Sequence, residues 1–441
     1  MENILHPEIT LEILSRLPVD SVLRCARVCK TWRALLLNNN YFADMHHHRQ
    51  LQLLQLDDDD QEYHHLLNNN SINYGAALAA KVGLGLLFWI GRIREEPGKL
   101  RLHYGEFYDE TNIDDEEEQE HEQQHDQYSS FYKKFFTRID YPPINKQQHR
   151  NAIIGSCNGL ICFSVRHHDI DDPVFIFNPI TREYIELPKY RQQLFQDCMV
   201  SGFGYHSSTN QYKVVRITYH PFDQGPDIGF VQVYTLGDGR GWRNTGQIAY
   251  SLLLSPGIPI NGALHWLDSQ GKILSFHLAN EEFRLLPSPP CVRPGHACRF
   301  YKLRNFGRCL CIVDRDEQGE SVDIWSLKKN SSYDMKDQNY YHSWSWTREL
   351  SIALKDLDVD DNQYEPIEPL ALTKSREIIL RQNLKILSVY DPKTASLKKL
   401  LDVDMGLKFF GAVPHMSSFV SLKALGENSK RIRRSRRIMQ R

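Results

Sequence analysis

A short pattern that recurs between residues 153 and 405 constrains the fold of this chain more than any other feature. Phe177, Phe276 and Tyr390 each precede a turn built on Asn-Pro, Asp-Pro or a substitute for them, and apolar residues follow six and nine positions after the first residue of the turn. A β-hairpin with one buried face requires this spacing. The pattern therefore predicts repeated antiparallel hairpins in this region.

Two looser copies extend the repeat, since Tyr234 leads to Trp242 and Trp325 leads to Trp344 and Trp346. The mean spacing of the five copies is roughly 53 residues, close to the ~50 of kelch-type propeller blades. The repeat thus predicts a mainly β domain that resembles a β-propeller. Each hairpin also has an upstream segment that we expect to be its inner strand, at residues 159–165, 212–217, 263–267, 309–313 and 378–381.

Ring closure requires strands from outside the five copies. The extended runs between residues 84 and 141 and those at 409–422 lack a full blade of their own, so we expect them to pair and form a sixth blade. Large aromatic residues are expected to fill the wedges between blades. The alternative is that His265, Trp266, Trp325, Trp344 and Trp346 gather around a ligand.

The first residues of the chain predict a small helical module instead of strands. Pro7 suits the first turn of a helix whose apolar stripe includes Ile13, and Pro18 ends that helix. Asp20 is placed to begin a second helix, and a third carries Trp32. Three such helices are too few to bury a full core, so a partner or the rest of the chain is expected to complete it.

The order of residues 7–9, 12–18 and 27–33 resembles the F-box, in the runs Pro-Glu-Ile, Glu-Ile-Leu-Ser-Arg-Leu-Pro and Arg-Val-Cys-Lys-Thr-Trp-Arg. His6 departs from that pattern. The resemblance implies a three-helix module that binds a Skp-type adaptor and so joins a cullin–RING ubiquitin ligase; a generic helical cap is the alternative. The residues expected to face the adaptor, or to shape the helices that do, are Leu5, Pro7, Ile9, Leu14, Leu17, Pro18, Leu23, Val28, Cys29 and Trp32.

The repeats resemble the plant F-box-associated domain, which is kelch-like. The runs that carry this resemblance are 155–160, 177–179, 261–266, 323–325 and 345–347, and the doubled glycines of true kelch repeats are missing. The resemblance implies a propeller-like domain of about six blades that recruits a substrate behind an F-box. The substrate itself, an unknown protein, is not encoded in any motif.

These patterns divide the chain into an F-box at 1–48, a polar linker at 49–80, a propeller-like domain at 81–424 and a basic tail at 425–441. His46, His47 and His48 open the polar stretch and are interpreted as solvated, with metal binding as the alternative. The linker is expected to be helical near 51–56. Residues 109–126 hold ten carboxylates and no Lys or Arg, so we expect a disordered acidic insertion at 109–130, with binding of a basic surface as the alternative.

The tail concentrates positive charge. It is interpreted as a nuclear import signal, as a phosphate-contacting arm or as a solvated terminus. The cations concerned are Lys430, Arg431, Arg433, Arg434, Arg436 and Arg437.

Composition narrows the class of function. A formal charge of −2 argues against an overall basic nucleic-acid binder. The nine cysteines lack any Cys-x-x-Cys pair, so reduced thiols in the nucleus, the cytoplasm or both are expected. The start of the chain lacks the pattern of a secretory signal, and the longest apolar run, 82–90, is half of what a bilayer requires, so no membrane partner is expected.

The sequence favours an adaptor over an enzyme. No nucleophile elbow, phosphate-binding loop or His-Glu-x-x-His motif occurs. The glycines at 237–241 are expected to form a hairpin turn, and the Cys25/Cys29 and Cys309/Cys311 pairs are expected to be small buried hydrophobes. No cofactor or metal is expected. A propeller scaffold without ligase attachment is one alternative, and a glycan-processing propeller with paired carboxylates is another.

Overall fold

The computed structural model describes most of the chain. Much of the expected linker, the acidic insertion at 109–130, Leu5, Arg433, Arg434, Arg436 and Arg437 lie outside the described residues. The residues described are 6–37, 39–55, 84–92, 101–107, 137–139, 151–167, 170–191, 197–220, 228–292, 301–307, 309–316, 320–329, 344–354, 367–373, 376–402 and 407–432.

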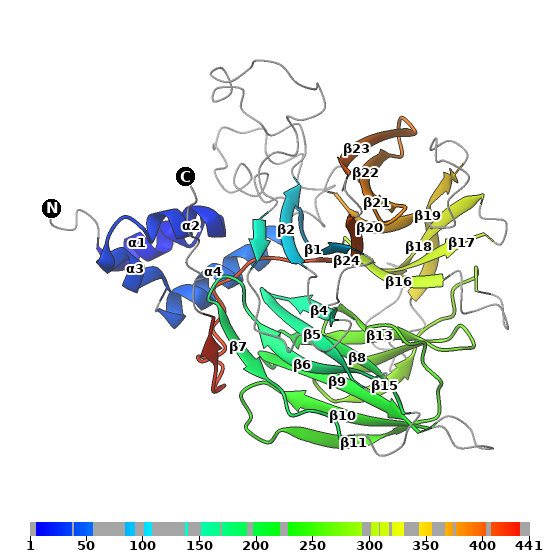
Figure 1. The fold of residues 1–441 in the computed structure, drawn as a ribbon, viewed down its shortest axis with the longest axis horizontal. Coiled ribbons are helices and arrows are strands. Elements are labelled where there is room, and N and C mark those ends of the chain that lie inside the picture. Colours follow the sequence, from blue (N-terminus) through cyan, green and yellow to red (C-terminus); the bar gives the residue numbers. More distant parts are fainter. Residues whose placement is uncertain are drawn as a thin grey trace.

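Strands dominate the fold, as the repeats predicted. Within the described residues they form six antiparallel sheets, arranged side by side as the blades of a propeller (Figure 1). Blades 1 to 5 each take their main strands from one continuous stretch of chain.

Blade 1 contains β4 (Asn151–Cys157), β5 (Leu160–His167), β6 (Ile170–Phe177) and β7 (Glu183–Glu186). Blade 2 contains β8 (Cys198–His206), β9 (Gln211–Tyr219), β10 (Gly229–Thr235) and β11 (Trp242–Ile248). Blade 3 contains β12 (Ile258–Ile260), β13 (Ala263–Leu267), β14 (Ile273–His277) and β15 (Glu282–Leu285). Blade 4 contains β16 (Tyr301–Phe306), β17 (Cys309–Arg315), β18 (Ser321–Lys329) and β19 (Trp344–Ala353). Blade 5 contains β20 (Glu368–Leu372), β21 (Ile378–Gln382), β22 (Ile386–Asp391) and β23 (Ser396–Asp402).

Blade 6 closes the ring with strands from both ends of the domain. It contains β24 (Leu407–Pro414), β1 (Leu84–Arg92), β2 (Arg101–Phe107) and β3 (Thr137–Ile139), in that spatial order. The antiparallel β24–β1 ladder runs from Leu86 opposite Pro414 to Arg92 opposite Leu407, with one irregularity after Trp89. The pairing of early with late strands that the sequence predicted is therefore confirmed.

The innermost strand of each blade is not the one that the sequence indicated. β4 contacts β8 and β24, β12 contacts β8 and β16, and β20 contacts β16 and β24, so these first strands line the axis of the ring. The segments predicted as inner strands, at 159–165, 212–217, 263–267, 309–313 and 378–381, form the second strands β5, β9, β13, β17 and β21. The true inner strands carry a weak signal because they can be as short as Ile258–Ile260.

The hydrophobic core lies between the blades. Each buried cluster of the propeller joins two neighbours, as where Val215 of blade 2 packs with Leu264 and Trp266 of blade 3. Strands sandwiched in this way are apolar on both faces, and all five residues of β13 are buried. Burial of this surface holds adjacent blades together.

The tryptophans fill the wedges between blades, as the sequence analysis expected of large aromatic residues. Trp266 lies between blades 2 and 3, whereas Trp325 and Trp344 pack in the cluster between blades 3 and 4. Two outer-strand tryptophans also donate hydrogen bonds to the preceding blade: Trp242 Nε1 to Pro188 O and Trp346 Nε1 to Pro287 O, both at 2.8 Å.

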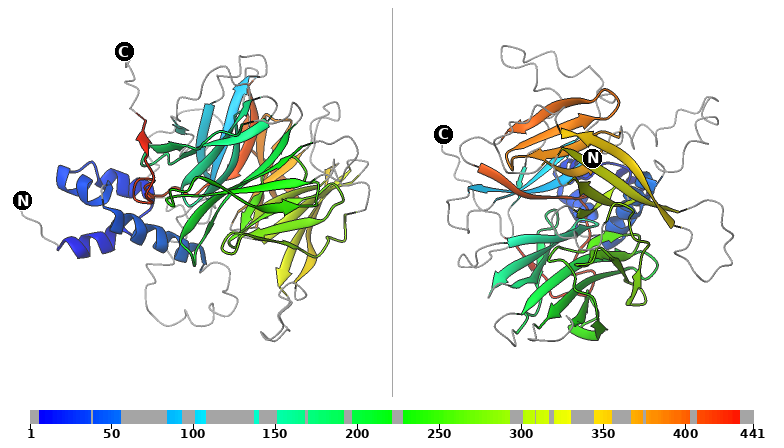
Figure 2. Two further views of the ribbon diagram at one scale, coloured as in Figure 1. Left: turned by 90° about the horizontal axis from the view of Figure 1, so that it is seen from below. Right: turned by 90° about the vertical axis from the view of Figure 1, so that its right-hand side faces the viewer.

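The N-terminal module lies at one side of the propeller (Figures 1 and 2). The predicted helices are present as α1 (Pro7–Leu14), α2 (Val19–Cys25) and α3 (Lys30–Leu37). Among the described residues a fourth and longer helix, α4 (Asn40–Gln55), follows them. Asn39 Oδ1 caps the start of α4 by accepting hydrogen bonds from the N–H groups of Tyr41 and Phe42. The helix continues to Gln55 and therefore crosses the domain boundary expected at residue 48.

Candidate docking surface of the helical module

The module has its own small core, made by the inward faces of its helices. Leu11 and Leu14 of α1 pack with Val22 of α2, Leu36 of α3 and Phe42 of α4. Leu14 is 6% exposed. It therefore shapes the module and cannot contact a partner directly.

Several large apolar side chains of the module point outward instead. Ile9 and Ile13, one helical turn apart on α1, are 50% and 48% exposed, and Val28 between α2 and α3 is 71% exposed. Together with Tyr41 they make up four of the seven exposed large hydrophobic residues in the described part of the chain. Such a concentration on a small module marks a binding surface.

The residues predicted to face or shape a docking surface fall into distinct groups. Pro7, Ile9, Val28 and Cys29 are exposed. Leu17, Pro18, Leu23 and Trp32 are half-buried, so each presents part of its surface. Ile13 was missed, although its spacing of four residues from Ile9 placed it on the same helix face.

Cys29 differs from its sequence-based interpretation as a buried hydrophobe. It is exposed, and its Sγ accepts a hydrogen bond from the Trp32 N–H at 3.4 Å. A side chain that accepts from a free N–H of the first turn caps the helix, so Cys29 helps to begin α3. The other three cysteines of that prediction are less exposed: Cys25 and Cys309 are half-buried and Cys311 is buried.

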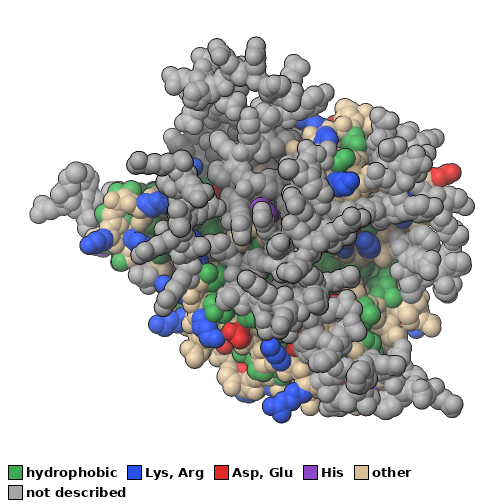
Figure 3. Space-filling model, in the orientation of Figure 1, with side chains coloured by type: hydrophobic (Ala, Val, Ile, Leu, Met, Phe, Trp, Pro, Cys, Tyr) green, Lys and Arg blue, Asp and Glu red, His purple; other side chains and the backbone are tan. Residues whose placement is uncertain are grey.

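The module also exposes basic side chains, and Lys and Arg side chains lie beside hydrophobic ones on the part of it that Figure 3 shows. The acidic Glu12 is engaged within the module by Arg16 at 2.9 Å and by Arg49 of α4. Hydrogen bonds from these two arginines lower the pKa of Glu12. The exposed cations of the module are Arg16, Arg24, Arg27, Lys30 and Arg33.

The histidines of α4 are not solvated linker residues, as the sequence had indicated. His46 and His47 are buried, whereas His48 is exposed. Burial lowers the pKa of His46 and of His47 to about 4. His46 Nε2 lies 2.9 Å from Leu17 O, and the His47 ring meets Tyr205 of the propeller edge-on at 6.4 Å.

The first two cations of the expected basic tail lie within the described residues. Lys430 and Arg431 form β25 (Lys430–Arg431), which pairs with the outer strand β7 of blade 1. Lys430 Nζ lies 2.9 Å from Glu186, and Arg431 lies 3.0 Å from Glu183. These two cations are therefore part of the folded domain.

Neither a metal site nor a membrane-spanning helix is found in the part of the chain that is described. It contains no cluster of three or more His, Cys, Asp or Glu side chains suited to a metal ion. None of its helices combines the length and apolar character needed to cross a bilayer.

The fold and this surface define a class of protein: a β-propeller that carries a helical docking module. A family model described as F-box associated beta propeller domain matches residues 115–401, and one described as F-box-like matches residues 7–44. The first match covers well over half of the chain. The chain therefore belongs to the F-box associated β-propeller family and is a plant-type F-box protein.

Similar proteins occur in Arabidopsis thaliana. The chain is 29% identical to F-box protein At3g07870 over 287 residues, which is 56% of this chain and 65% of that protein. It is 28% identical to F-box/kelch-repeat protein At3g23880 over 45% of this chain and 52% of that one, and 27% identical to F-box protein CPR1 over 52% and 58%. The matches thus span between about half and two thirds of these relatives.

Proposed function

We propose that this chain is the substrate-recognition subunit of an SCF-type E3 ubiquitin ligase. The helical module would bind a Skp-type adaptor, and through it the cullin and RING subunits, while the propeller binds a target protein for ubiquitination and degradation. The observation that carries the proposal is the outward exposure of Ile9, Ile13 and Val28 on a module whose other large apolar residues, apart from Tyr41, are buried or half-buried.

The chemistry of the module supports an adaptor with an apolar groove and an acidic rim. Exposed isoleucine and valine side chains gain free energy when a partner covers them. The module exposes five cations against the three carboxylates of Glu8, Asp20 and Asp44, and this excess of positive charge favours a partner of negative potential and speeds its association. A Skp-type adaptor is expected to have both properties.

The target is expected to bind away from the module. The module and the C-terminal segment lie at the rim that carries the β4–β5 and β6–β7 turns, since Ser418 bonds to Asn158 O and Asn178 bonds to Ser418 O. The opposite rim, where the innermost strands begin, faces away from the adaptor. Tethering there raises the effective concentration of the target near a ubiquitin-charged enzyme to the order of millimolar, so the chain itself need not catalyse any bond breakage.

The nucleus, the cytoplasm or both are the proposed location, supported by the lack of disulfide bonds among the described cysteines. A nuclear import role of the tail would depend mainly on Arg433, Arg434, Arg436 and Arg437, because Lys430 and Arg431 are held in ion pairs.

Calorimetric titration of the full chain with a purified Skp-type adaptor tests the proposal. Changing Ile9→Asp and Ile13→Asp together should weaken binding at least about tenfold, equal to about 1.4 kcal/mol, because two charges replace the apolar contact. Leu254→Asp is the control, since Leu254 is 72% exposed but belongs to the propeller. Absence of binding by the unaltered chain would reject the ligase role and leave a propeller scaffold as the remaining function.

A further inference from the structure

The chain does not end at the strand that closes the ring. Residues 415–432, which we name the C-terminal strap, continue from β24 along the rim that faces the helices and end as β25 on blade 1 (Figures 1 and 2). The strap begins with a hydrogen bond from His415 N to Gly85 O at 2.9 Å. It therefore connects blades 6 and 1 outside the ring of innermost strands.

One face of the strap is built into the propeller. Val420 and Leu422 are buried in the cluster between blades 1 and 2, with Phe203 among their neighbours. Asn178, which is fully buried, donates from Nδ2 to Ser418 O at 3.1 Å and to Val420 O at 2.7 Å. Because a buried amide that lost these acceptors would remain unpaired, Asn178 holds the strap firmly.

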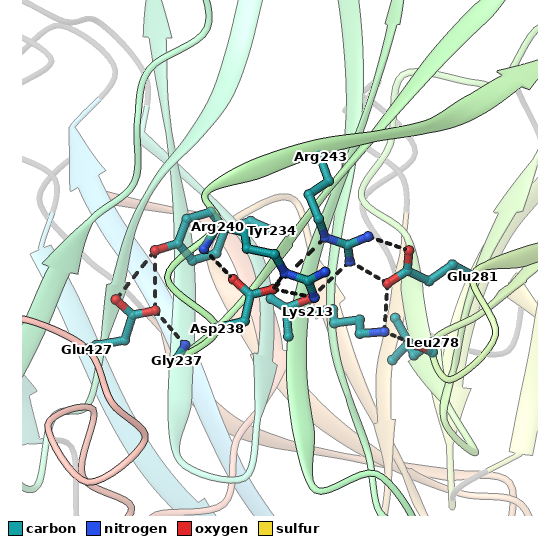
Figure 4. Close-up of polar contacts among 10 residues, drawn as sticks. Lys213, Tyr234, Gly237, Asp238, Arg240, Arg243, Leu278, Glu281 and Glu427 are labelled. Carbon is teal, nitrogen blue, oxygen red and sulfur yellow. Dashed lines mark hydrogen bonds and ion pairs between the residues drawn. The ribbon is translucent and has the colours of Figure 1, made fainter.

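Shortly before β25, the strap is also anchored on blade 2 (Figure 4). Glu427 accepts hydrogen bonds from the Gly237 N–H at 2.8 Å and from the Tyr234 hydroxyl at 3.2 Å. A Cβ atom added at Gly159 would lie 2.1 Å from Ser418 Oγ, and one added at Gly237 would lie 1.8 Å from Leu425 O. Two turns of the propeller therefore need glycine to let the strap approach.

The other face of the strap enters the helical module. Phe419, adjacent to Val420, is 4% exposed and belongs to the core of the helices. Its ring lies 5.9 Å from that of Phe42 and meets the His46 ring edge-on at 5.1 Å. Ile180, from the β6–β7 turn of blade 1, packs against the same cluster. Neighbouring residues of one strap thus fill two different cores.

We propose that the strap fixes the helical module to the propeller, and that Phe419 is the positioning residue for ubiquitin transfer. The second half of this statement rests on the proposed ligase function, whereas the first half concerns the chain alone. A rigid junction would hold adaptor and target at one separation and orientation, and such orientation limits which lysines a tethered enzyme can reach. Phe419 acts through the helices and touches neither adaptor nor target.

The distance between the two parts tests the first half. Spin labels are attached through noncanonical residues at Glu8 on α1 and Glu282 on β15, and dipolar spectroscopy measures their separation in the full chain. The unaltered chain should give one narrow distance, and Phe419→Ala should replace it with a broad distribution. Val420→Ala is the matched control: it removes a neighbouring side chain from the propeller core, so it should lower the melting temperature but keep the narrow distance.

Two further variants guard against a simple failure to fold. Asn178→Ala loosens the strap from the propeller side and should also broaden the distribution, while Phe419→Leu retains a large apolar side chain and should restore the narrow one. A narrow distance in both Phe419→Ala and Asn178→Ala would overturn the proposal.

Self-ubiquitination in a ligase reconstituted with adaptor, cullin, RING and conjugating enzyme tests the second half. Mass spectrometry should find modification confined to few propeller lysines in the unaltered chain and spread over more in Phe419→Ala, with unchanged adaptor affinity. An identical lysine pattern at equal affinity would overturn the positioning role. Failure of the unaltered chain to bind any adaptor would reject that role together with the ligase function, and the distance measurement would still decide whether the strap fixes the module.

Discussion

Glu368 shows how a single charged residue can join two blades. It lies buried on β20 of blade 5 and contacts Lys302 of blade 4 at 3.0 Å, as well as Arg304 of blade 4 and Arg381 of its own blade. Burial alone would raise the pKa of Glu368, but Arg304, Arg381 and Lys302 outweigh burial and lower the pKa to about 2. The carboxylate is therefore more stable as an anion in the folded chain than in the unfolded one.

This difference makes the stability of the propeller sensitive to acid. The folded pKa of about 2 lies below the ordinary value of 4.5, so the stabilisation is complete above about pH 4.5 and is lost as the pH falls toward 2. The full contribution is about 3 kcal/mol. Chemical denaturation across that range should show a shallower loss of stability in Glu368→Gln, which should also be less stable near pH 7 because three cations lose their anion.

Glu282→Gln removes a carboxylate from the exposed surface of β15 and serves as the control for this measurement. If the free energy of unfolding fell as steeply with decreasing pH in Glu368→Gln as in the unaltered chain, Glu368 would not be the source of the acid sensitivity.

At the scale of an element, the β10–β11 turn combines two glycines with the same backbone requirement and different surroundings. Gly237 and Gly239 have φ of +79° and +70°, where a side chain is strained. A Cβ atom at Gly237 would collide with Leu425 O of the strap, whereas one at Gly239 would meet nothing within 4 Å. The pair therefore separates backbone strain from contact with the strap.

Gly239→Ala should destabilise the chain by about 1 kcal/mol through backbone strain alone. Gly237→Ala should lower the free energy of unfolding by more than this, because Leu425 must move away. It should also expose the backbone amides of the strap to solvent. Chemical denaturation gives the first quantity, and hydrogen exchange of the amides at 424–428 reports the second. Equal effects of the two changes on both measurements would show that the strap does not rest on this turn.

At the scale of the whole molecule, strands from both ends of the propeller domain hold the ring together. β24 supplies the innermost strand of blade 6, and the cluster of Leu87 and Trp89 with Phe163 joins that blade to blade 1. Because β1 and β24 are far apart in the sequence, closure of the ring depends on a long-range strand pairing, which is slow to form. The helical module is then completed by Phe419, which comes from beyond the closing strand.

Two truncations should separate closure from attachment of the module. Removal of residues 415–441 deletes the strap but leaves β24, so the propeller should still unfold cooperatively at a lower temperature. Removal of residues 403–441 also deletes β24, which opens blade 6 and should abolish cooperative unfolding. Calorimetry makes the comparison, and cooperative unfolding of the shorter chain would contradict the role of β24.

The amino-acid sequence alone determined the hairpins, the class of fold and the module. The turns after Phe177, Phe276 and Tyr390 are local features, and an apolar residue at a fixed distance from a turn signals one-sided burial whatever surrounds it. Of the four exposed large apolar residues of the module, Ile9 and Val28 were named from the sequence, whereas Ile13 and Tyr41 were not. Helix spacing shows which residues share a face, but it does not show whether that face is covered, so Leu14 proved to be buried.

Only the tertiary structure decided which strands line the axis, why His46 and His47 are buried, and where the chain goes after β24. These features depend on contacts between distant residues, such as that from Asn178 to Val420 across 242 positions. A run of histidines has the composition of a solvated linker, and it is buried here because Phe419 and Tyr205 approach it from the far end of the chain and from blade 2. A local sequence pattern does not predict such long-range contacts, because the free energy that favours them is gained only when the ring has closed.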